Sequence, residues 1–124
     1  MSTRVLVVED EAITRFMMTE MCDELGYRCK TAANGEQVLE VLERDPDIAD
    51  VILMDIHMPK LSGDDVTRRI RQADTDPPKN VFILAVTADQ DWHDLERCRA
   101  AGFNGVIPKP VSLRSIEAAI QVLR

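Results

Sequence analysis

Val51-Ile52-Leu53-Met54-Asp55 is the stretch that decides the fold, because four consecutive apolar residues end directly on a carboxylate. A run that is apolar at every position is typical of a strand buried on both faces of a sheet. Residues 5–8 and 81–86 form two more runs of this kind, and residues 27–31 and 106–107 are weaker candidates. The sequence therefore predicts five strands, and the third strand delivers Asp55 to its carboxyl end.

Amphipathic segments with helical periodicity separate these runs. They span residues 12–25, 36–44, 64–73, 91–101 and 113–123. The first segment carries an apolar residue at every fourth position, at Ile13, Met17, Met21 and Leu25. This spacing predicts the buried face of the first helix, and Phe16 is expected to pack against the core as well. Ser112 precedes the last segment and is expected to be its N-cap.

Five strands that alternate with five helices predict a parallel sheet with right-handed crossovers and helices on both faces. The expected fold class is therefore α/β, with a doubly wound sheet. In open sheets of this class, the functional crevice lies at the carboxyl ends of the strands. The length fits a single domain over residues 1–124. The start at Met1 and the end at Arg124, after a complete helix, favour a stand-alone protein.

The composition argues against several classes of function. A formal net charge of −7 makes the chain a poor partner for nucleic acids, whose phosphates would repel it. No apolar run approaches the roughly 20 residues of a membrane span, and the first residues lack a secretion signal, so a cytoplasmic protein is expected. The three cysteines, Cys22, Cys29 and Cys98, lack metal-ligand spacing. We expect them to be reduced thiols, with Cys22 and Cys98 packed on helices.

Polar side chains follow the predicted strands at the points where the strands end. They are Glu9 and Asp10 after the first strand, Asp55 after the third, Thr87 after the fourth and Lys109 after the fifth. Three converging carboxylates repel one another unless a cation lies between them. Carboxylate oxygens without Cys or His suit Mg²⁺. We therefore expect Asp10 and Asp55 to bind Mg²⁺ directly, and Glu9 to bind it through water.

A carboxylate beside Mg²⁺ can attack phosphorus and form an aspartyl phosphate. Asp55 is the candidate for this role. Lys109 is expected to pair with one phosphoryl oxygen, and the Thr87 hydroxyl to donate a hydrogen bond to another. Ala88 is small and leaves room for the group. The pattern thus predicts phosphoryl chemistry at this edge of the sheet.

Four groups of residues together resemble the receiver domain of bacterial two-component response regulators. They are Glu9-Asp10, Met54-Asp55-Ile56-His57-Met58-Pro59 with Gly63, Thr87-Ala88, and Lys109-Pro110. The resemblance covers essentially the whole chain in matching order and spacing. It implies a flavodoxin-like sheet with the strand order 2-1-3-4-5. A histidine kinase or histidine phosphotransfer protein would then be the partner whose phosphohistidine supplies the phosphoryl group to Asp55.

The resemblance also implies roles for neighbouring residues. The backbone carbonyl of His57 would complete the metal site, and the Lys109–Pro110 peptide bond would be cis. Thr87 and Lys109 would sense the phosphoryl group, which the domain would slowly hydrolyse by itself. The last two helices and the last strand would then change, and a downstream protein or a second copy of the chain would bind there. Val106 departs from the family, because many receivers have an aromatic residue at this position.

Three other interpretations compete with a stand-alone receiver. The same domain could belong to a hybrid histidine kinase. A phosphohydrolase of the haloacid-dehalogenase type would use a similar aspartate, but it usually needs a second acid where this chain has His57. A flavodoxin-like cofactor binder would need glycines and hydroxyls in its first loop, where this chain has Glu9, Asp10 and Glu11.

Overall fold

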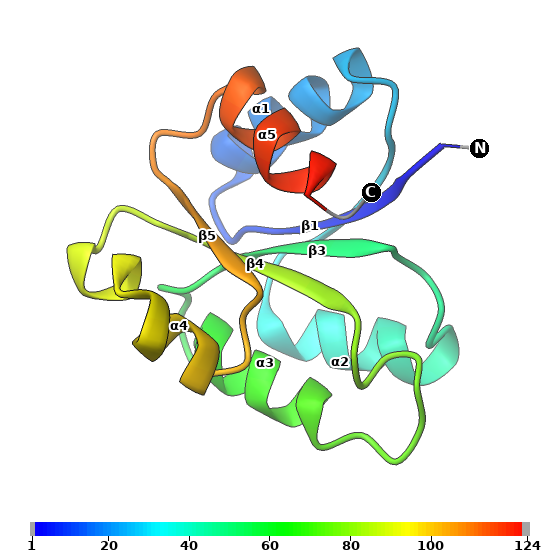
Figure 1. Cartoon of the computed structure of the whole chain (residues 1–124). Helices are drawn as coiled ribbons and strands as arrows, with labels where there is room; N and C mark the ends of the chain where they lie inside the picture. Colours follow the sequence, from blue (N-terminus) through cyan, green and yellow to red (C-terminus); the bar gives the residue numbers. More distant parts are fainter. Residues whose placement is uncertain (1, 123–124) are drawn as a thin grey trace.

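The computed structural model describes residues 2–122 and contains one five-stranded parallel sheet. Its strands are β1 (Arg4–Val8), β2 (Arg28–Ala32), β3 (Val51–Asp55), β4 (Phe82–Thr87) and β5 (Gly105–Pro108). Their order across the sheet is β2-β1-β3-β4-β5, so β2 and β5 are the edge strands (Figure 1). The predicted fold class and strand order are confirmed.

Helices connect the strands as predicted, with one difference. They are α1 (Ala12–Glu24), α2 (Gly35–Arg44), α3 (Gly63–Arg71), α4 (Leu95–Ala100) and α5 (Leu113–Gln121), with the 3-10 turn η1 (Gln90–His93) before α4. The helix expected over 91–101 is divided because Asp94 caps a new helix, and its side chain accepts hydrogen bonds from the backbone N–H groups of Glu96 and Arg97. Ser112 caps α5 as predicted. Leu123, expected in the apolar stripe of that helix, lies outside the described residues.

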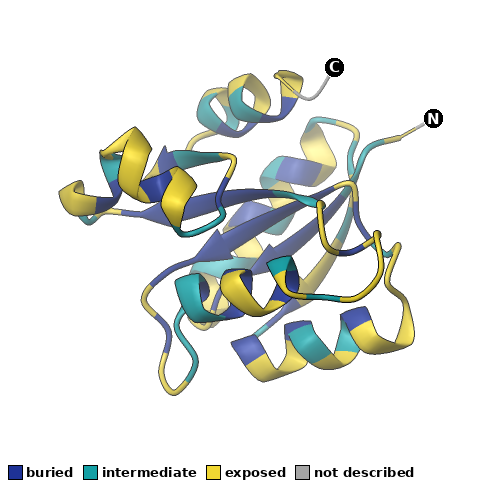
Figure 2. Ribbon diagram, turned by 60° about the horizontal axis from the view of Figure 1, so that its bottom comes forward, coloured by how far each residue is buried: buried dark blue, intermediate teal, exposed yellow. Residues whose placement is uncertain are grey.

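The helices cover both faces of the sheet (Figure 1). Alternate strand residues point to opposite faces. Val5 and Val7 therefore pack on the face covered by α1 and α5, whereas Leu6 and Val8 pack on the face covered by α2, α3 and α4. Figure 2 shows strands that are buried along most of their length, whereas the helices are buried only on the side toward the sheet. Within residues 2–122, no helix has the length and apolar composition needed to cross a membrane.

The buried face of α1 differs from the prediction. Its fully buried residues are Met18 and Cys22, and Met21 and Leu25 are only partly buried beside them. Ile13 and Met17 face the solvent, with exposed fractions of 72% and 51%. Positions four apart advance by about 40° around a helix, so the predicted row turns away from the core toward the start of α1.

Phe16 is also exposed, at 64% of its surface, so the prediction that it packs in the core is wrong. Together with Ile13 and Met17 it forms an apolar surface on the first two turns of α1, which we call the α1 patch. The patch lies at the end of α1 nearest the carboxyl ends of the strands, because α1 begins four residues after β1 ends. An apolar surface of this kind often marks a contact site for another molecule.

Gly63, the first residue of α3, is the position where a glycine is most tightly required. Its N–H donates a hydrogen bond to the carbonyl oxygen of Ile56, at 2.8 Å. A Cβ atom at Gly63 would lie 2.2 Å from the carbonyl oxygen of Asp55 and 2.8 Å from the Cα of Ile56. The start of α3 is therefore pressed directly against the backbone that carries Asp55.

We predict that Gly63→Ala lowers the free energy of unfolding by about 2–3 kcal/mol, because the backbone of either α3 or β3 must move to admit the methyl group. Gly105→Ala is the matched control. Its Cβ would meet only Cδ2 of Leu84, the end of a flexible side chain, at 3.1 Å. That variant should stay within about 1 kcal/mol of the wild type. Urea denaturation measures both, and equal midpoints for the two variants would contradict the prediction.

Candidate functional site

Parallel strands bring the predicted site residues to one edge of the sheet. Asp55 is the last residue of β3, Thr87 is the last residue of β4, and Glu9 and Lys109 directly follow β1 and β5. Glu9, Asp10 and Asp55 each offer a carboxylate oxygen, and the three oxygens lie within 4.8 Å of one another. The sequence thus predicted correctly that these side chains converge.

Lys109 lies between the two buried carboxylates of the site. Its Nζ is 3.1 Å from Oε1 of Glu9 and 3.3 Å from Oδ1 of Asp55. Glu9 and Asp55 are only 1% and 2% exposed, whereas Asp10 is exposed. The peptide bond from Lys109 to Pro110 is cis, as the family resemblance implied. One ammonium group therefore offsets only part of the negative charge that the fold gathers here.

The charge imbalance appears in the acid–base properties of the site. Burial and the nearby charge of Glu9 raise the pKa of Asp55 from its ordinary value of 3.8 to about 7, although Lys109 opposes the shift. Burial would lower the pKa of Lys109, but its hydrogen bonds and ion pairs with Glu9 and Asp55 outweigh this effect and raise it. Lys109 is therefore charged at neutral pH, whereas the carboxyl group of Asp55 is only partly ionised near pH 7 in the absence of a metal ion.

The residues around Thr87 connect the site to η1. The Thr87 hydroxyl accepts a hydrogen bond from the backbone N–H of Asp89, at 3.0 Å, and its carbonyl oxygen accepts one from the N–H of Lys109, also at 3.0 Å. The hydroxyl proton of Thr87 remains available to a further acceptor. His57, in the loop after β3, has an exposed side chain, and its Nε2 is 3.3 Å from Oδ2 of Asp89.

The donor set fits a hard divalent cation. Three carboxylates supply oxygen ligands, and among the described residues the carbonyl oxygen of His57 accepts no hydrogen bond that would compete with a metal. Glu9 and Asp55 are buried with a single cation between them, so a second positive charge would relieve their repulsion. Oxygen ligands of this kind, on a site with one exposed side, are the type that Mg²⁺ prefers.

The sequence did not indicate how Glu9 is held. The backbone N–H of Glu9 donates to the carbonyl oxygen of Ala32, at 3.1 Å, and its carbonyl oxygen accepts a hydrogen bond from Nη1 of Arg15, at 2.8 Å. The N–H of Glu11 donates to Oε2 of Glu9, at 3.1 Å. The sequence feature that could have indicated this was Arg15, one turn into α1, because the long side chain of an arginine at this position can reach back to the end of β1.

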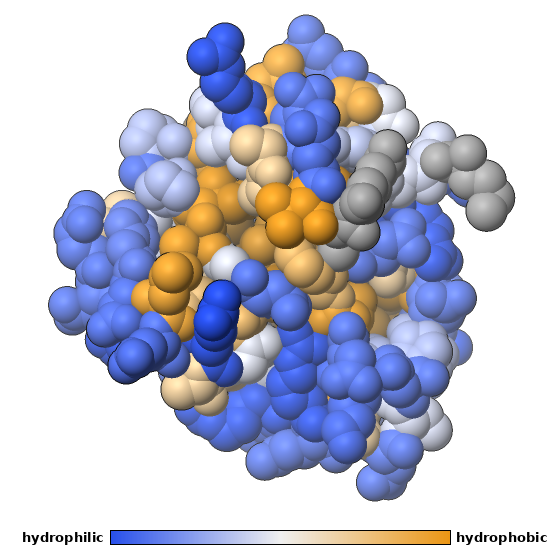
Figure 3. All heavy atoms as spheres, in the orientation of Figure 1, coloured by the Kyte–Doolittle hydropathy of each residue, from blue (hydrophilic) through white to orange (hydrophobic). Residues whose placement is uncertain are grey.

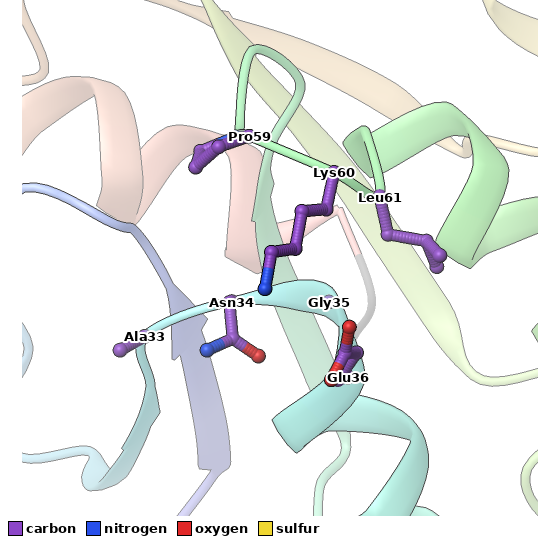
Figure 4. Close-up of a pocket in the computed structure, with 7 residues that line it drawn as sticks. All are labelled: Ala33, Asn34, Gly35, Glu36, Pro59, Lys60 and Leu61. Atoms are coloured by element: carbon purple, nitrogen blue, oxygen red, sulfur yellow. The ribbon is translucent and has the colours of Figure 1, made fainter.

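A separate pocket of about 230 Å³ lies between the loops that follow β2 and β3 (Figure 4). It is lined by Ala33, Asn34, Gly35, Glu36, Pro59, Lys60 and Leu61. Figure 4 shows the side chain of Lys60 extending toward the loop that precedes α2. The lining contains one carboxylate, that of Glu36, and none of the convergent residues described above. This pocket therefore takes no part in the candidate site.

We predict that, without a metal ion, Asp55→Asn becomes more stable relative to the wild type as the pH rises. Between about pH 4 and pH 7 the unfolded carboxyl group has lost its proton while the folded one keeps it, so this group lowers the stability of the wild type as the pH increases. The free energy of unfolding of Asp55→Asn, relative to the wild type, should rise by about 3 kcal/mol from about pH 4.5 to about pH 8.

Urea titrations with a chelator present measure this difference. Asp10→Asn is the matched control, because it removes an exposed carboxylate of the same cluster and keeps the buried carboxyl group of Asp55, so it should retain the loss of stability with rising pH. A stability difference between Asp55→Asn and the wild type that is independent of pH would contradict a raised pKa for Asp55.

Comparison with curated proteins places the chain among signalling proteins. It is 34% identical over 118 residues to the sensor histidine kinase RcsC of Salmonella typhi, and the matched region covers 95% of this chain and 12% of that protein. It is 32% identical over 118 residues to the virulence sensor protein BvgS of Bordetella pertussis, covering 93% of this chain and 9% of that protein. The chain thus spans about a tenth of the length of these relatives.

Solved structures agree with this placement. The chemotaxis protein CheY4 of Vibrio cholerae matches with a TM-score of 0.87 and 25% identity, covering 100% of both chains. The receiver domain of a sensor histidine kinase of Pseudomonas aeruginosa, with a magnesium ion coordinated in its active site cleft, matches with a TM-score of 0.84 and 33% identity, covering 98% of this chain and 97% of the other. The family model of the response regulator receiver domain matches residues 5–121. The chain therefore belongs to the response regulator receiver domain family.

Proposed function

We propose that Asp55 is the phosphoacceptor of this receiver domain and that its carboxylate receives a phosphoryl group from a phosphohistidine. The observation that carries the proposal is the place of Asp55 at the end of β3, buried, 3.3 Å from the ammonium group of Lys109 and within 4.8 Å of two further carboxylates. A lone strand-end aspartate needs none of these neighbours, whereas an anionic transition state needs compensating charge around it.

The reaction is a transfer between two nucleophiles. An oxygen of Asp55 attacks the phosphorus, the bond between phosphorus and the imidazole nitrogen breaks, and the electron pair of that bond leaves with the imidazole. Lys109 pairs with one of the phosphoryl oxygens, and the hydroxyl group of Thr87 donates a hydrogen bond to another. Glu9, Asp10, Asp55 and the carbonyl oxygen of His57 would hold Mg²⁺, which when bound supplies positive charge to the phosphoryl oxygens.

Phosphorylation would act as a switch because Thr87 and Lys109 are joined through the backbone. The N–H of Lys109 donates to the carbonyl oxygen of Thr87, so a movement of either residue displaces the ends of both β4 and β5. Shifting a two-state domain from mostly inactive to mostly active requires about 5.5 kcal/mol of differential interaction. A few charge-assisted hydrogen bonds to the new phosphoryl oxygens can provide an energy of that order.

Trp92 lies in η1, the turn that follows β4 and Thr87. It is buried and packs edge-on against Phe103, with ring centroids 5.8 Å apart, while the guanidinium group of Arg97 lies 4.4 Å above its ring. Val106, on β5, packs against the same side of the core. We therefore propose that the shift reaches α4 through η1 and Trp92, in place of an aromatic residue at position 106.

The surface formed by α4, β5 and α5 is the proposed output face. Figure 3 shows hydrophobic side chains gathered around β5, between α5 and α4. Leu95 on α4 and Val122 after α5 are among the exposed large apolar residues of the molecule. A downstream protein or a second copy of the chain would bind here.

We also propose that residues 1–124 belong to a single domain and that this domain works in the cytoplasm.

The direct test of the phosphoacceptor is a mass measurement after incubation with a small phosphodonor, such as acetyl phosphate, and Mg²⁺. The wild type should gain one phosphoryl group, and the adduct should be lost when a chelator is added before the donor or when Asp55 is replaced in Asp55→Asn. Asp50→Asn is the matched control and should be phosphorylated like the wild type, because Asp50 directly precedes β3 and lies away from Asp55 at the other end of that strand. An adduct on Asp55→Asn equal to that of the wild type would exclude the proposal.

The donor should dock over the α1 patch, because its phosphohistidine must reach Asp55 and its contact surface must therefore border the site. A pocket of about 440 Å³ adjoins the patch and extends to the site itself. It is lined by Thr14, Met17, Ala88, Lys109, Pro110 and Val111. Met17 belongs to both the patch and the pocket, and Lys109 belongs to both the pocket and the site. The apolar surface is thus continuous with the charged groups that would receive the phosphoryl group.

We predict that Phe16→Ala slows phosphoryl transfer from phosphorylated histidine phosphotransfer domains at least tenfold, because we expect Phe16 to be one of the few anchor residues of the interface, and the loss of such an anchor costs about 1.4 kcal/mol or more, about a tenfold change. Transfer from acetyl phosphate should be unchanged, because that donor needs no docking surface. Leu95→Ala on α4 is the matched control and should leave both rates unchanged. Equal slowing with the protein donor and the small donor would contradict docking at the α1 patch.

A further inference from the structure

Two neighbouring methionines of α1 have opposite surroundings. Met17 is exposed over 51% of its surface, whereas Met18 is only 1% exposed and packs in the core between the sheet and α1. Three further methionines lie within residues 2–122, and all of them are partly or fully buried: Met21, Met54 and Met58. Met17 is therefore the one methionine in the described part of the chain that is exposed to solvent.

Met17 also occupies the place where the α1 patch meets the site. It lines the pocket of about 440 Å³ together with Lys109, and it shares the patch with Ile13 and Phe16. A thioether at this place is apolar and extends the apolar surface, whereas a sulfoxide is polar. The character of the surface beside Lys109 therefore depends on the oxidation state of one sulfur atom.

We propose that Met17 is an oxidative modification site, at which a hydroperoxide forms methionine sulfoxide and thereby weakens docking of the phosphohistidine donor. The modification itself does not depend on the chemistry of Asp55. Its effect on phosphoryl transfer rests on the proposed function, in which the donor docks over the α1 patch. Met18 is the internal comparison, because it carries the same functional group at the next position of the same helix and is buried.

The reaction consumes one hydroperoxide. The sulfur of Met17 attacks the terminal oxygen of the peroxide, a sulfur–oxygen bond forms and the O–O bond breaks. The proton of the transferred hydroxyl passes to the departing oxygen, which leaves as water from hydrogen peroxide or as an alcohol from an organic peroxide. The sulfur is oxidised by two electrons, and the peroxide is reduced by the same two electrons. Methionine sulfoxide reductases return the thioether, so the modification is reversible.

Burial decides which methionine reacts first, because the peroxide must reach the sulfur. Met18 lies in a closely packed core, so an oxidant reaches it only when the fold opens locally. Met17 needs no such opening, and water can hydrate the oxygen that it gains without entering the core. The fold and the carboxylates of the site should therefore survive oxidation of Met17, while the apolar surface of the α1 patch is reduced.

The first part of the test locates the added oxygen. The full chain is treated with a limiting amount of hydrogen peroxide and then with dithiothreitol, which restores the thiols of its three free cysteines and leaves sulfoxides in place. Trypsin cleaves after Arg15 and Arg28, so the methionines of α1 share the peptide of residues 16–28, and fragmentation of this peptide tells them apart. Oxygen should appear on Met17 before it appears on any other methionine of residues 2–122.

The second part measures phosphoryl transfer after the peroxide has been removed. Transfer from a phosphorylated histidine phosphotransfer domain to the oxidised wild type should slow by about tenfold, as expected when an apolar contact of an interface becomes polar. Methionine sulfoxide reductases should restore the original rate. Acetyl phosphate should phosphorylate the oxidised and the untreated protein equally fast, because that donor needs no docking surface.

Two variants make the outcome decisive, and each is compared with its own rate before peroxide. Met17→Leu should keep its rate, because leucine is apolar and has no sulfur to oxidise. Met21→Leu is the matched control on the same helix and should slow as the wild type does, because it retains Met17.

Four results would overturn the proposal. They are oxygen on Met18 as early as on Met17, an unchanged rate with the protein donor once Met17 is oxidised, equal slowing of Met17→Leu, and equal slowing with acetyl phosphate. Failure of the proposed function would look different. The untreated protein would then gain no phosphoryl group from acetyl phosphate, or Phe16→Ala would transfer from the protein donor as fast as the wild type.

Discussion

The contact of Lys109 with the buried carboxylates of Glu9 and Asp55 is the interaction on which the rest of the structure depends. Burying two carboxylates side by side is unfavourable, and one ammonium group compensates for only part of the cost. The energy that pays for the arrangement is the apolar packing of the strands behind it, since β1, β3 and β4 are buried over most of their length. A rigid sheet can hold groups in a geometry that they would leave if they were free to move.

This shortage of positive charge explains why one place can bind a cation and accept a phosphoryl group. A cation is favoured because it supplies the charge that is missing. Under the proposed function, Lys109 and a bound Mg²⁺ would both supply positive charge to the phosphoryl group. Thr87 adds a hydrogen-bond donor whose own position depends on Asp89 and Lys109. In the proposed function, Thr87 and Lys109 would therefore take part in both the chemistry and the signal.

Much of this could be predicted from the sequence, because the strands here are apolar at every position and end on polar residues. That pattern located Glu9, Asp55, Thr87 and Lys109 at one edge of the sheet. The face of α1 was predicted wrongly, since a repeat of four residues drifts around a helix and does not show where the sheet lies. The division of the fourth helix at Asp94 was also missed, because a capping side chain competes with helical periodicity.

The two edges of the sheet differ in a way that affects how copies of the chain meet. β2 has the sequence Arg-Cys-Lys-Thr-Ala, and its Arg28, Lys30 and Thr31 are exposed. Charged side chains on an edge strand resist pairing with a second strand, because the new neighbour would have to cover them. β5, at the other edge, is short and lies beside α4 and α5. Growth of the sheet by strand addition is thus discouraged at β2, where a second copy of the chain would have to cover two basic side chains.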